Sequence, residues 1–157
     1  MSNLAKLRKV FSKSIAAKAK SLSGRPLTKI EMRRVRESIS DDIRKFTDLI
    51  TPMVSKMADV RAQKMKVELD KVGWHDQRRF DPGRKIFHLE HFYTVKSIKE
   101  SCSNASEVWE INEILTKTVR VVWILKKEDR RLTALGHGRV RKNPEKAYEE
   151  AGIEIVK

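Results

Sequence analysis

The chain has 157 residues, enough for one domain with a hydrophobic core, and 36% of them are charged, against about 25% in ordinary soluble domains. Lysine and arginine outnumber the acids by 35 to 21, which gives a net charge of +14. No apolar run reaches the roughly 20 residues of a membrane span, and one cysteine, Cys102, cannot form a disulfide within the chain. These features exclude a disulfide scaffold and predict a protein of a reducing compartment, with no membrane partner.

The positive charge is concentrated in the N-terminal part of the sequence. Residues 1–36 carry eleven lysines or arginines and one acid, Glu31, and so supply +10 of the net charge. Such blocks are typical of surfaces that face nucleic acid, because each cation that neutralises a phosphate releases a condensed counterion. A basic helix that only aids solubility has the same composition. We predict a polyanionic partner, nucleic acid, with DNA favoured over RNA.

The first 22 residues contain no acid and have the pattern of an amphipathic helix. Four apolar residues carry this pattern: Leu4, Leu7, Phe11 and Ile15. Residues 23–26, with a glycine and a proline, should end the helix, so residues 1–25 are predicted to form a basic arm. An organelle transit peptide looks the same, so organelle targeting stays open beside a cytoplasmic location, which would be nucleoid-associated or, in a eukaryote, nuclear.

Residues 26–72 are also predicted to be helical. Thr28 and Glu31 have the spacing of a capping box, in which each side chain satisfies a backbone amide at the start of a helix. Apolar residues then recur at helical intervals, and Thr51-Pro52 has the pattern of a further helix start that runs on to Gly73. Long charged helices can pair with a second copy of the chain, so a homo-oligomer is a further expectation.

After Gly73 the sequence predicts short strands between short helices. Residues 86–93 and 119–125 are rich in β-branched and aromatic side chains, which favour strands. The other predicted elements are an interrupted helix at 94–117, helices at 127–135 and 143–152, and an edge strand at 153–156. Trp109 and Trp123 are expected in the core. The predicted fold class is α+β, with a helical N-terminal half followed by a small mixed α/β domain at 73–157.

Catalytic residue types concentrate at His88-Leu89-Glu90-His91. In a regular strand His88 and Glu90 share one face and His91 lies on the other, which argues against a simple three-ligand metal site. A twist or bulge at a strand end would instead let Glu90 and His91 reach one site. A carboxylate can bind a hard divalent cation, and a neutral imidazole can accept a proton from water. Histidines that pair with nearby acids for structural reasons give the same pattern.

Glu90-His91 on a strand, a later strand, and a helix that contains Asp129 together resemble the ββα-metal core of the HNH, or His-Me finger, nucleases. The resemblance covers residues 86–135. It implies hydrolysis of phosphodiester bonds with one Mg²⁺ or Mn²⁺, bound by Glu90 and Asp129, and with His91 as the general base. The helix position that holds Asp129 is usually His or Asn in that family. His88 and His137 are further candidates for the site.

Basic residues that could contact phosphates recur along the chain. We single out Lys6, Arg8, Lys9, Lys13, Arg33, Arg34 and Arg36 in the N-terminal part, and Arg78, Arg79, Arg84, Lys126, Lys127, Arg130, Arg131, Arg139 and Arg141 around the candidate site. Such contacts position a nucleic acid without reading its sequence. Trp74, Phe80 and Tyr93 could stack on unpaired bases, although each is also a candidate for ordinary packing.

Three hypotheses for the function follow. The protein is a metal-dependent, HNH-like endonuclease; or it binds DNA or RNA without catalysis, and the His-Glu-His cluster is structural; or it is a protein-binding accessory factor, of a viral or prophage kind, that acts through its helices. Metal-dependent cleavage separates the first from the second. Salt-sensitive binding of nucleic acid separates both from the third.

Overall fold

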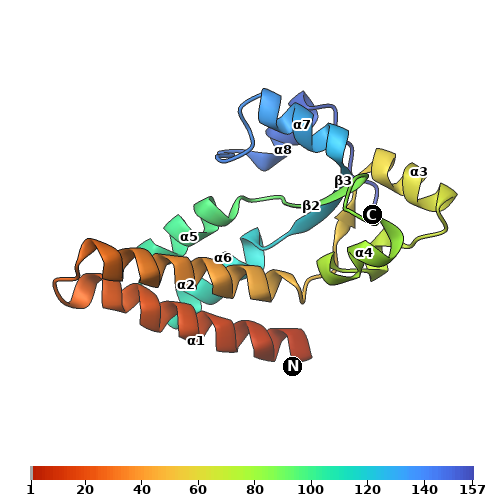
Figure 1. The fold of residues 1–157 in the computed structure, drawn as a ribbon. Helices are drawn as coiled ribbons and strands as arrows, with labels where there is room; N and C mark the ends of the chain where they lie inside the picture. Colours follow the sequence, from red (N-terminus) through yellow and green to blue (C-terminus); the bar gives the residue numbers. More distant parts are fainter. Residues whose placement is uncertain (1) are drawn as a thin grey trace. The chain divides into compact units, whose positions relative to one another are not determined.

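The computed structural model describes residues 2–157, which divide into two compact units (Figure 1). The helical unit comprises the chain up to Leu49 together with Val95–Val119, and the sheet unit comprises Ile50–Thr94 and Arg120–Lys157. This division differs from the predicted boundaries near residues 25 and 73. The reason is long-range packing: a pair of helices from the middle of the chain packs against the N-terminal helices, and local sequence patterns do not reveal such contacts.

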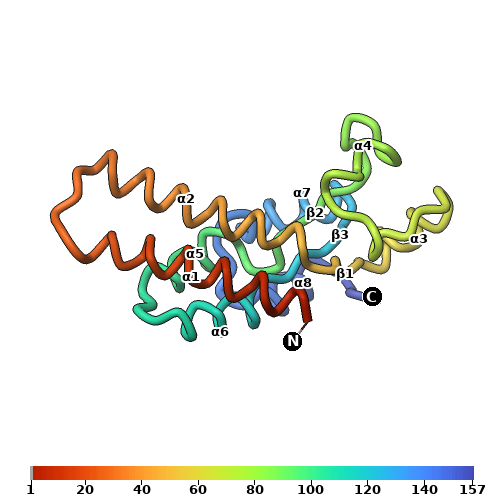
Figure 2. The backbone as a smooth tube through the Cα atoms, turned by 90° about the horizontal axis from the view of Figure 1, so that it is seen from below, coloured from red at the N-terminus to blue at the C-terminus, as the bar shows by residue number. Residues whose placement is uncertain are grey.

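The helical unit contains four helices, which are α1 (Asn3–Gly24), α2 (Lys29–Thr47), α5 (Val95–Asn104) and α6 (Val108–Thr118). Helices α1 and α2 lie side by side and antiparallel, as Figures 1 and 2 both show. The rings of Phe11 on α1 and Phe46 on α2 pack with their centroids 5.5 Å apart, and Ile15, Ile43 and Phe46 are fully buried. Helix α1 is therefore part of a packed unit, and the prediction that residues 1–25 form a separate arm is wrong.

Local signals set the boundaries of these helices. The capping box is present: the Thr28 hydroxyl accepts from the Glu31 amide at 3.2 Å, and the Glu31 carboxylate accepts from the Thr28 amide at 2.8 Å. The helix start predicted at Thr51-Pro52 is wrong, because the chain there enters a short strand, β1 (Met53–Val54). A helix, α3 (Lys56–Lys64), begins only after Ser55, whose hydroxyl accepts from the Ala58 amide.

The sheet unit is built around three strands in the order β1-β3-β2. Strands β2 (Phe87–His91) and β3 (Val121–Leu125) confirm the two main predicted strands, and they pair antiparallel, while β1 pairs parallel with β3. All five residues of β3 are buried, which explains why this strand is an unbroken apolar run. The predicted edge strand at 153–156 is reduced to one bridge, between Ser55 and Ile155.

Both faces of the sheet are covered by helices. On one face Val122 and Ile124 pack with α7 (Lys126–Ala134) and α8 (Pro144–Glu150), mainly against Leu132 and Tyr148. On the other face Trp123 packs with α3 and with α4 (Gln77–Phe80). The fold class is α+β, as predicted. No helix within residues 2–157 has the length and apolar character needed to cross a membrane.

Of the two tryptophans expected in the core, one is buried and the other is exposed. Trp123 is fully buried, and its indole Nε1 donates to the Val72 carbonyl at 3.0 Å. Trp109, however, is 66% exposed. Ile111 and Leu115 occupy the buried face of α6, and Trp109 lies about 200° around the helix from Ile111, so its side chain points away from the core.

We therefore expect opposite results from the same substitution at these two positions. Trp123→Ala should lower the free energy of unfolding by about 3 to 5 kcal/mol, the usual cost of truncating a buried aromatic residue. Trp109→Ala should change it by no more than about 0.5 kcal/mol, as surface substitutions do. Urea denaturation of both variants tests this, and equal losses would contradict the assignment of the two side chains.

Candidate metal centre and basic surface

The register between β2 and β3 decides which side chains of β2 can meet. His88 is paired with Ile124 and Glu90 with Val122. Cross-strand partners project from the same face of a sheet, so His88 and Glu90 share the face that α7 and α8 cover. Both side chains therefore point from β2 towards the helix that follows β3.

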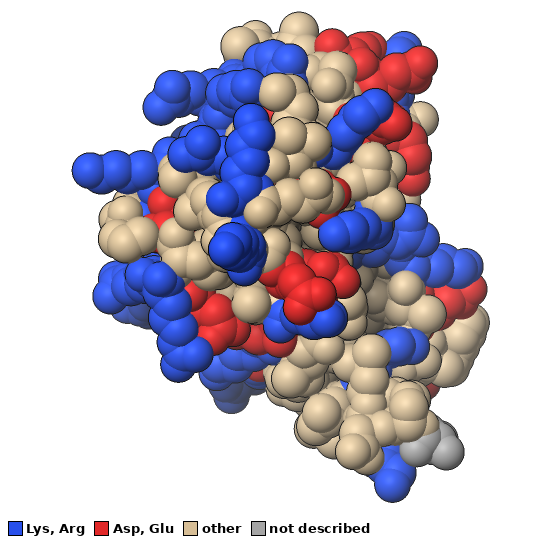
Figure 3. Space-filling view, turned by 90° about the vertical axis from the view of Figure 1, so that its right-hand side faces the viewer, with Lys and Arg blue, Asp and Glu red and all other residues tan. Residues whose placement is uncertain are grey.

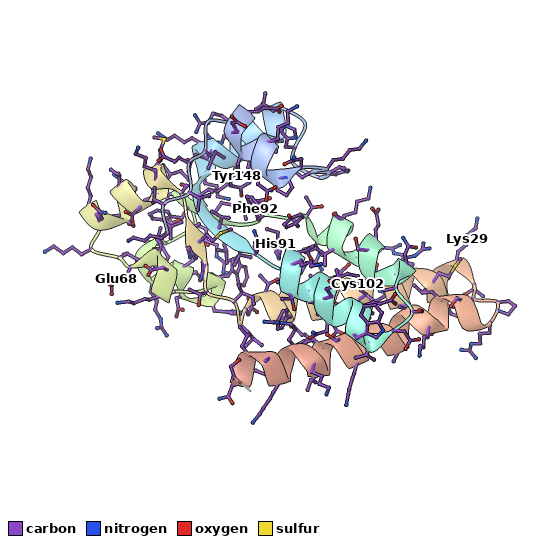
Figure 4. All side chains as sticks on the ribbon, turned by 180° about the vertical axis from the view of Figure 1, so that it is seen from behind. Lys29, Glu68, His91, Phe92, Cys102 and Tyr148 are labelled. Atoms are coloured by element: carbon purple, nitrogen blue, oxygen red, sulfur yellow. The ribbon has the colours of Figure 1, made fainter. Side chains whose placement is uncertain are left out.

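His91 belongs to the opposite face of the sheet. It is paired with Val121 at the end of β2, where Figure 4 labels it, and Leu89, on the same face, is paired with Trp123. No bulge interrupts the pairing from Phe87 to His91. The side chains of Glu90 and His91 therefore do not converge on one site. The resemblance to the HNH nucleases had implied that they would. The side chains of β2 alternate between the two faces of the sheet up to its last residue, His91, whereas that prediction required a twist or bulge.

Helix α7 begins directly after β3, and a buried carboxylate fixes its start. Glu128 is fully buried; its Oε2 accepts from the Leu125 amide and from the Ser55 hydroxyl, both at 2.8 Å. This contact holds the first turn of α7 against the end of the sheet. Asp129 is the next residue, and 30% of its side chain is exposed. Its carboxylate lies close to His88, a residue of β2.

His88, Glu90 and Asp129 form a compact group at the surface of the sheet unit. Each offers one ligand atom, and these three atoms lie within 4.8 Å of one another. His88 Nε2 is 2.9 Å from Glu90 Oε2 and 3.9 Å from Asp129 Oδ1. Two carboxylates and one imidazole form a donor set that suits a divalent cation such as Mg²⁺, Mn²⁺ or Zn²⁺.

Arg141 holds Glu90 in place from a loop that follows α7. Its side chain is almost completely buried, and its guanidinium donates to the Glu90 carboxylate and to the carbonyls of His91, Phe92 and His137. Arg141 is therefore not available to a phosphate, and the prediction that it binds nucleic acid is wrong. Sequence reasoning missed this role, because nothing in the basic run at 139–142 distinguishes a buried arginine from exposed ones.

The two partners of Glu90 keep its carboxylate ionised. Burial on its own would raise the pKa of Glu90, but hydrogen bonds from His88 and Arg141 and the charge of Arg141 outweigh it, so that the pKa lies below its ordinary value. A carboxylate that stays negative at low pH is the form that binds a metal ion.

His137, the other candidate histidine, lies outside this group. Its Nε2 is 2.8 Å from a carboxylate oxygen of Glu150, and its carbonyl accepts from Arg141. It therefore helps to position Arg141 but provides no ligand atom to the group of three.

The remaining basic candidates are at the surface, in both units. Most are exposed, and Lys and Arg cover much of the face shown in Figure 3, with acids in smaller patches between them. Arg33 and Arg34 are paired with Glu37 on their own helix. Arg84 is half-buried, with its guanidinium 3.5 Å from the ring centroid of Trp74.

One hollow of the helical unit is lined by five cations, two of which, Arg33 and Arg36, are among the residues predicted from the sequence. It has a volume of about 650 Å³ and runs along α2, with Lys99 of α5 at its edge. Within residues 2–157, Lys29, Arg36 and Lys99 have no ion pair, whereas the two acids of the hollow, Glu37 and Asp41, are paired with other arginines of α2.

Comparison with protein-family models, with curated proteins and with solved structures found no match to this chain.

Removal of Arg141 should destabilise the protein in a pH-dependent way. Arg141→Met leaves Glu90 buried without its main cation, and breaking a buried ion pair costs about 3 to 5 kcal/mol. The depressed pKa of Glu90 contributes stability above its unfolded value of 4.5, and this contribution is lost as the pH falls through the folded value. The deficit of the variant should therefore be largest at pH 7 and smaller at pH 3.

The matched control is Arg139→Met, which removes an exposed arginine from the same loop. It should change the stability by no more than about 0.5 kcal/mol at either pH. Part of the Arg141→Met deficit should persist at pH 3, because three backbone carbonyls also lose a donor. A deficit that is the same at both pH values would contradict the assigned role of the Glu90 charge.

Proposed function

We propose that the protein is a metal-dependent phosphodiesterase that acts on nucleic acid. The observation that carries this proposal is the convergence of His88, Glu90 and Asp129, whose ligand atoms lie within 4.8 Å of one another on a strand–strand–helix unit. A divalent cation at this group would polarise a phosphate oxygen and lower the pKa of a bound water molecule.

The protein's own groups have distinct roles in this proposal. Glu90, held by Arg141, is the fixed and ionised ligand. His88 and Asp129 are more exposed, at 34% and 30% of their side chains, so their side of the group is the one open to substrate and water. Lys126 precedes Asp129 by three residues and so lies on the same side of α7, which suits it to a flanking phosphate.

A second candidate function has its own support. Both oxygens of Glu90 already accept hydrogen bonds, one from His88 and one from Arg141, so this carboxylate is satisfied without any cation. A protein with this arrangement could bind nucleic acid through its basic surfaces and use the cluster only to join β2 to α7. The two candidates differ in whether a divalent cation changes the substrate.

Cleavage of a labelled DNA or RNA strand in Mg²⁺ or Mn²⁺ separates these candidates. Asp129→Asn and His88→Ala should each lower the rate at least about 100-fold, since the loss of an outer partner of a metal ligand alone costs 10- to 100-fold. His91→Ala should keep most of the rate, because His91 faces away from the group. Melting curves of all three variants serve as the control for folding.

Two outcomes would overturn the phosphodiesterase proposal. Binding of nucleic acid without cleavage in any divalent cation would leave the non-catalytic binding protein as the answer. Loss of cleavage in His91→Ala but not in His88→Ala would place the chemistry on the other face of the sheet.

The basic hollow of the helical unit should dominate the salt dependence of binding. Replacing Lys29, Arg36 and Lys99 by Gln should reduce the slope of log affinity against log salt by up to about 2.7 on duplex DNA, at roughly 0.9 per phosphate contact. The matched control replaces Lys56, Lys71 and Lys117, which are ion-paired within the chain. If both triple variants flatten the slope equally, net charge alone governs binding.

A further inference from the structure

Trp109 is a large apolar side chain on the outside of the helical unit. It is 66% exposed, the highest value of any tryptophan in the chain, on a helix whose other face is well packed. A single exposed apolar side chain needs no partner by itself, so the surroundings of this ring decide whether it is a binding site.

Two hollows lie beside the indole of Trp109. One, of about 500 Å³, lies between α1 and α6, and Ala5 and Val108 form its apolar part. The other, of about 450 Å³, lies on the α5 side of α6 and includes Ile114. Helices α1, α5 and α6 belong to the same unit and pack together (Figure 2). Volumes of this size are typical of sites for small organic groups.

The hollow between α1 and α6 carries a net positive charge, because two cations, Arg8 and Lys9, line it beside one acid, Glu107. Within residues 2–157 neither Arg8 nor Lys9 has an ion pair with an acid. The Arg8 Nη1 donates to the Thr116 hydroxyl at 2.8 Å, which fixes the guanidinium against α6, while its Nε is buried without a partner. A fixed guanidinium and a free ammonium beside one exposed ring favour an anionic partner with a flat apolar group.

We propose that this hollow binds an unpaired nucleotide of a nucleic-acid strand, with the base stacked on Trp109 and the adjoining phosphates on Arg8 and Lys9. The proposal rests on the proposed function, since it takes nucleic acid to be the partner, and it adds that the strand is single at this point. Stacking on one ring is tolerant of sequence, because every base has a π-face. An acidic amphipathic helix fits less well, because it needs a row of apolar pockets and the hollow offers a single ring.

Fluorescence anisotropy with a labelled oligothymidylate and with a duplex of equal length tests the proposal. Trp109→Ala should weaken binding of the single strand by at least about fivefold, as the loss of a stacking aromatic does, and binding of the duplex by less than twofold. Trp109→Phe should restore much of the loss, because it keeps a ring. Val10→Ala is the control, since Val10 is an exposed apolar residue of α1 outside the hollow.

The outcomes that overturn the proposal are distinct. Single-strand binding that does not depend on Trp109, or equal losses for the single strand and the duplex, contradict this site but leave the proposed function standing. Absence of binding by the unmodified protein to both forms overturns both. Self-association in sedimentation that Trp109→Ala abolishes would show instead that a second copy of the chain covers the ring.

Discussion

The position of the candidate metal ligands depends on the register between β2 and β3. The pairs His88–Ile124 and Glu90–Val122 turn both ligands towards α7, and a slip by one residue would turn them to the opposite face and bring His91 under the helix. The register is firmly set, because β3 is buried on both sides, with Ile124 in one core and Trp123 in the other. The same strand leads without a loop into α7, which carries Asp129.

A small set of buried charges links this sheet to the chain that follows it. Arg141 bonds to Glu90 and to the carbonyls at the end of β2, so one side chain orients the ligand and also fastens the strand end to the loop after α7. Burial on its own would raise the pKa of Glu90, but His88 and Arg141 lower it below its ordinary value. Stability and the proposed chemistry therefore use the same contacts, and a substitution at Arg141 should disturb both.

The sequence predicted those features that depend on neighbouring residues. The capping box at Thr28, the two main strands and the start of α8 at Pro144 follow from local patterns, and the structure confirms them. Local patterns do not encode long-range packing, so the division into units, the exposure of Trp109 and the burial of Arg141 were not foreseen. In the site, strand alternation predicted that His88 and Glu90 share a face, whereas the bulge that would bring Glu90 and His91 together is absent from the pairing of Phe87–His91.

In the proposed function, His88, Glu90 and Asp129 hold one divalent cation. The most direct measurement is anomalous diffraction from a crystal of the protein grown or soaked in Mn²⁺. We expect an anomalous peak among the three side chains, at bond lengths of about 2.0 to 2.6 Å from their ligand atoms. No peak at this group, or a peak on the face of the sheet that carries His91, would contradict it.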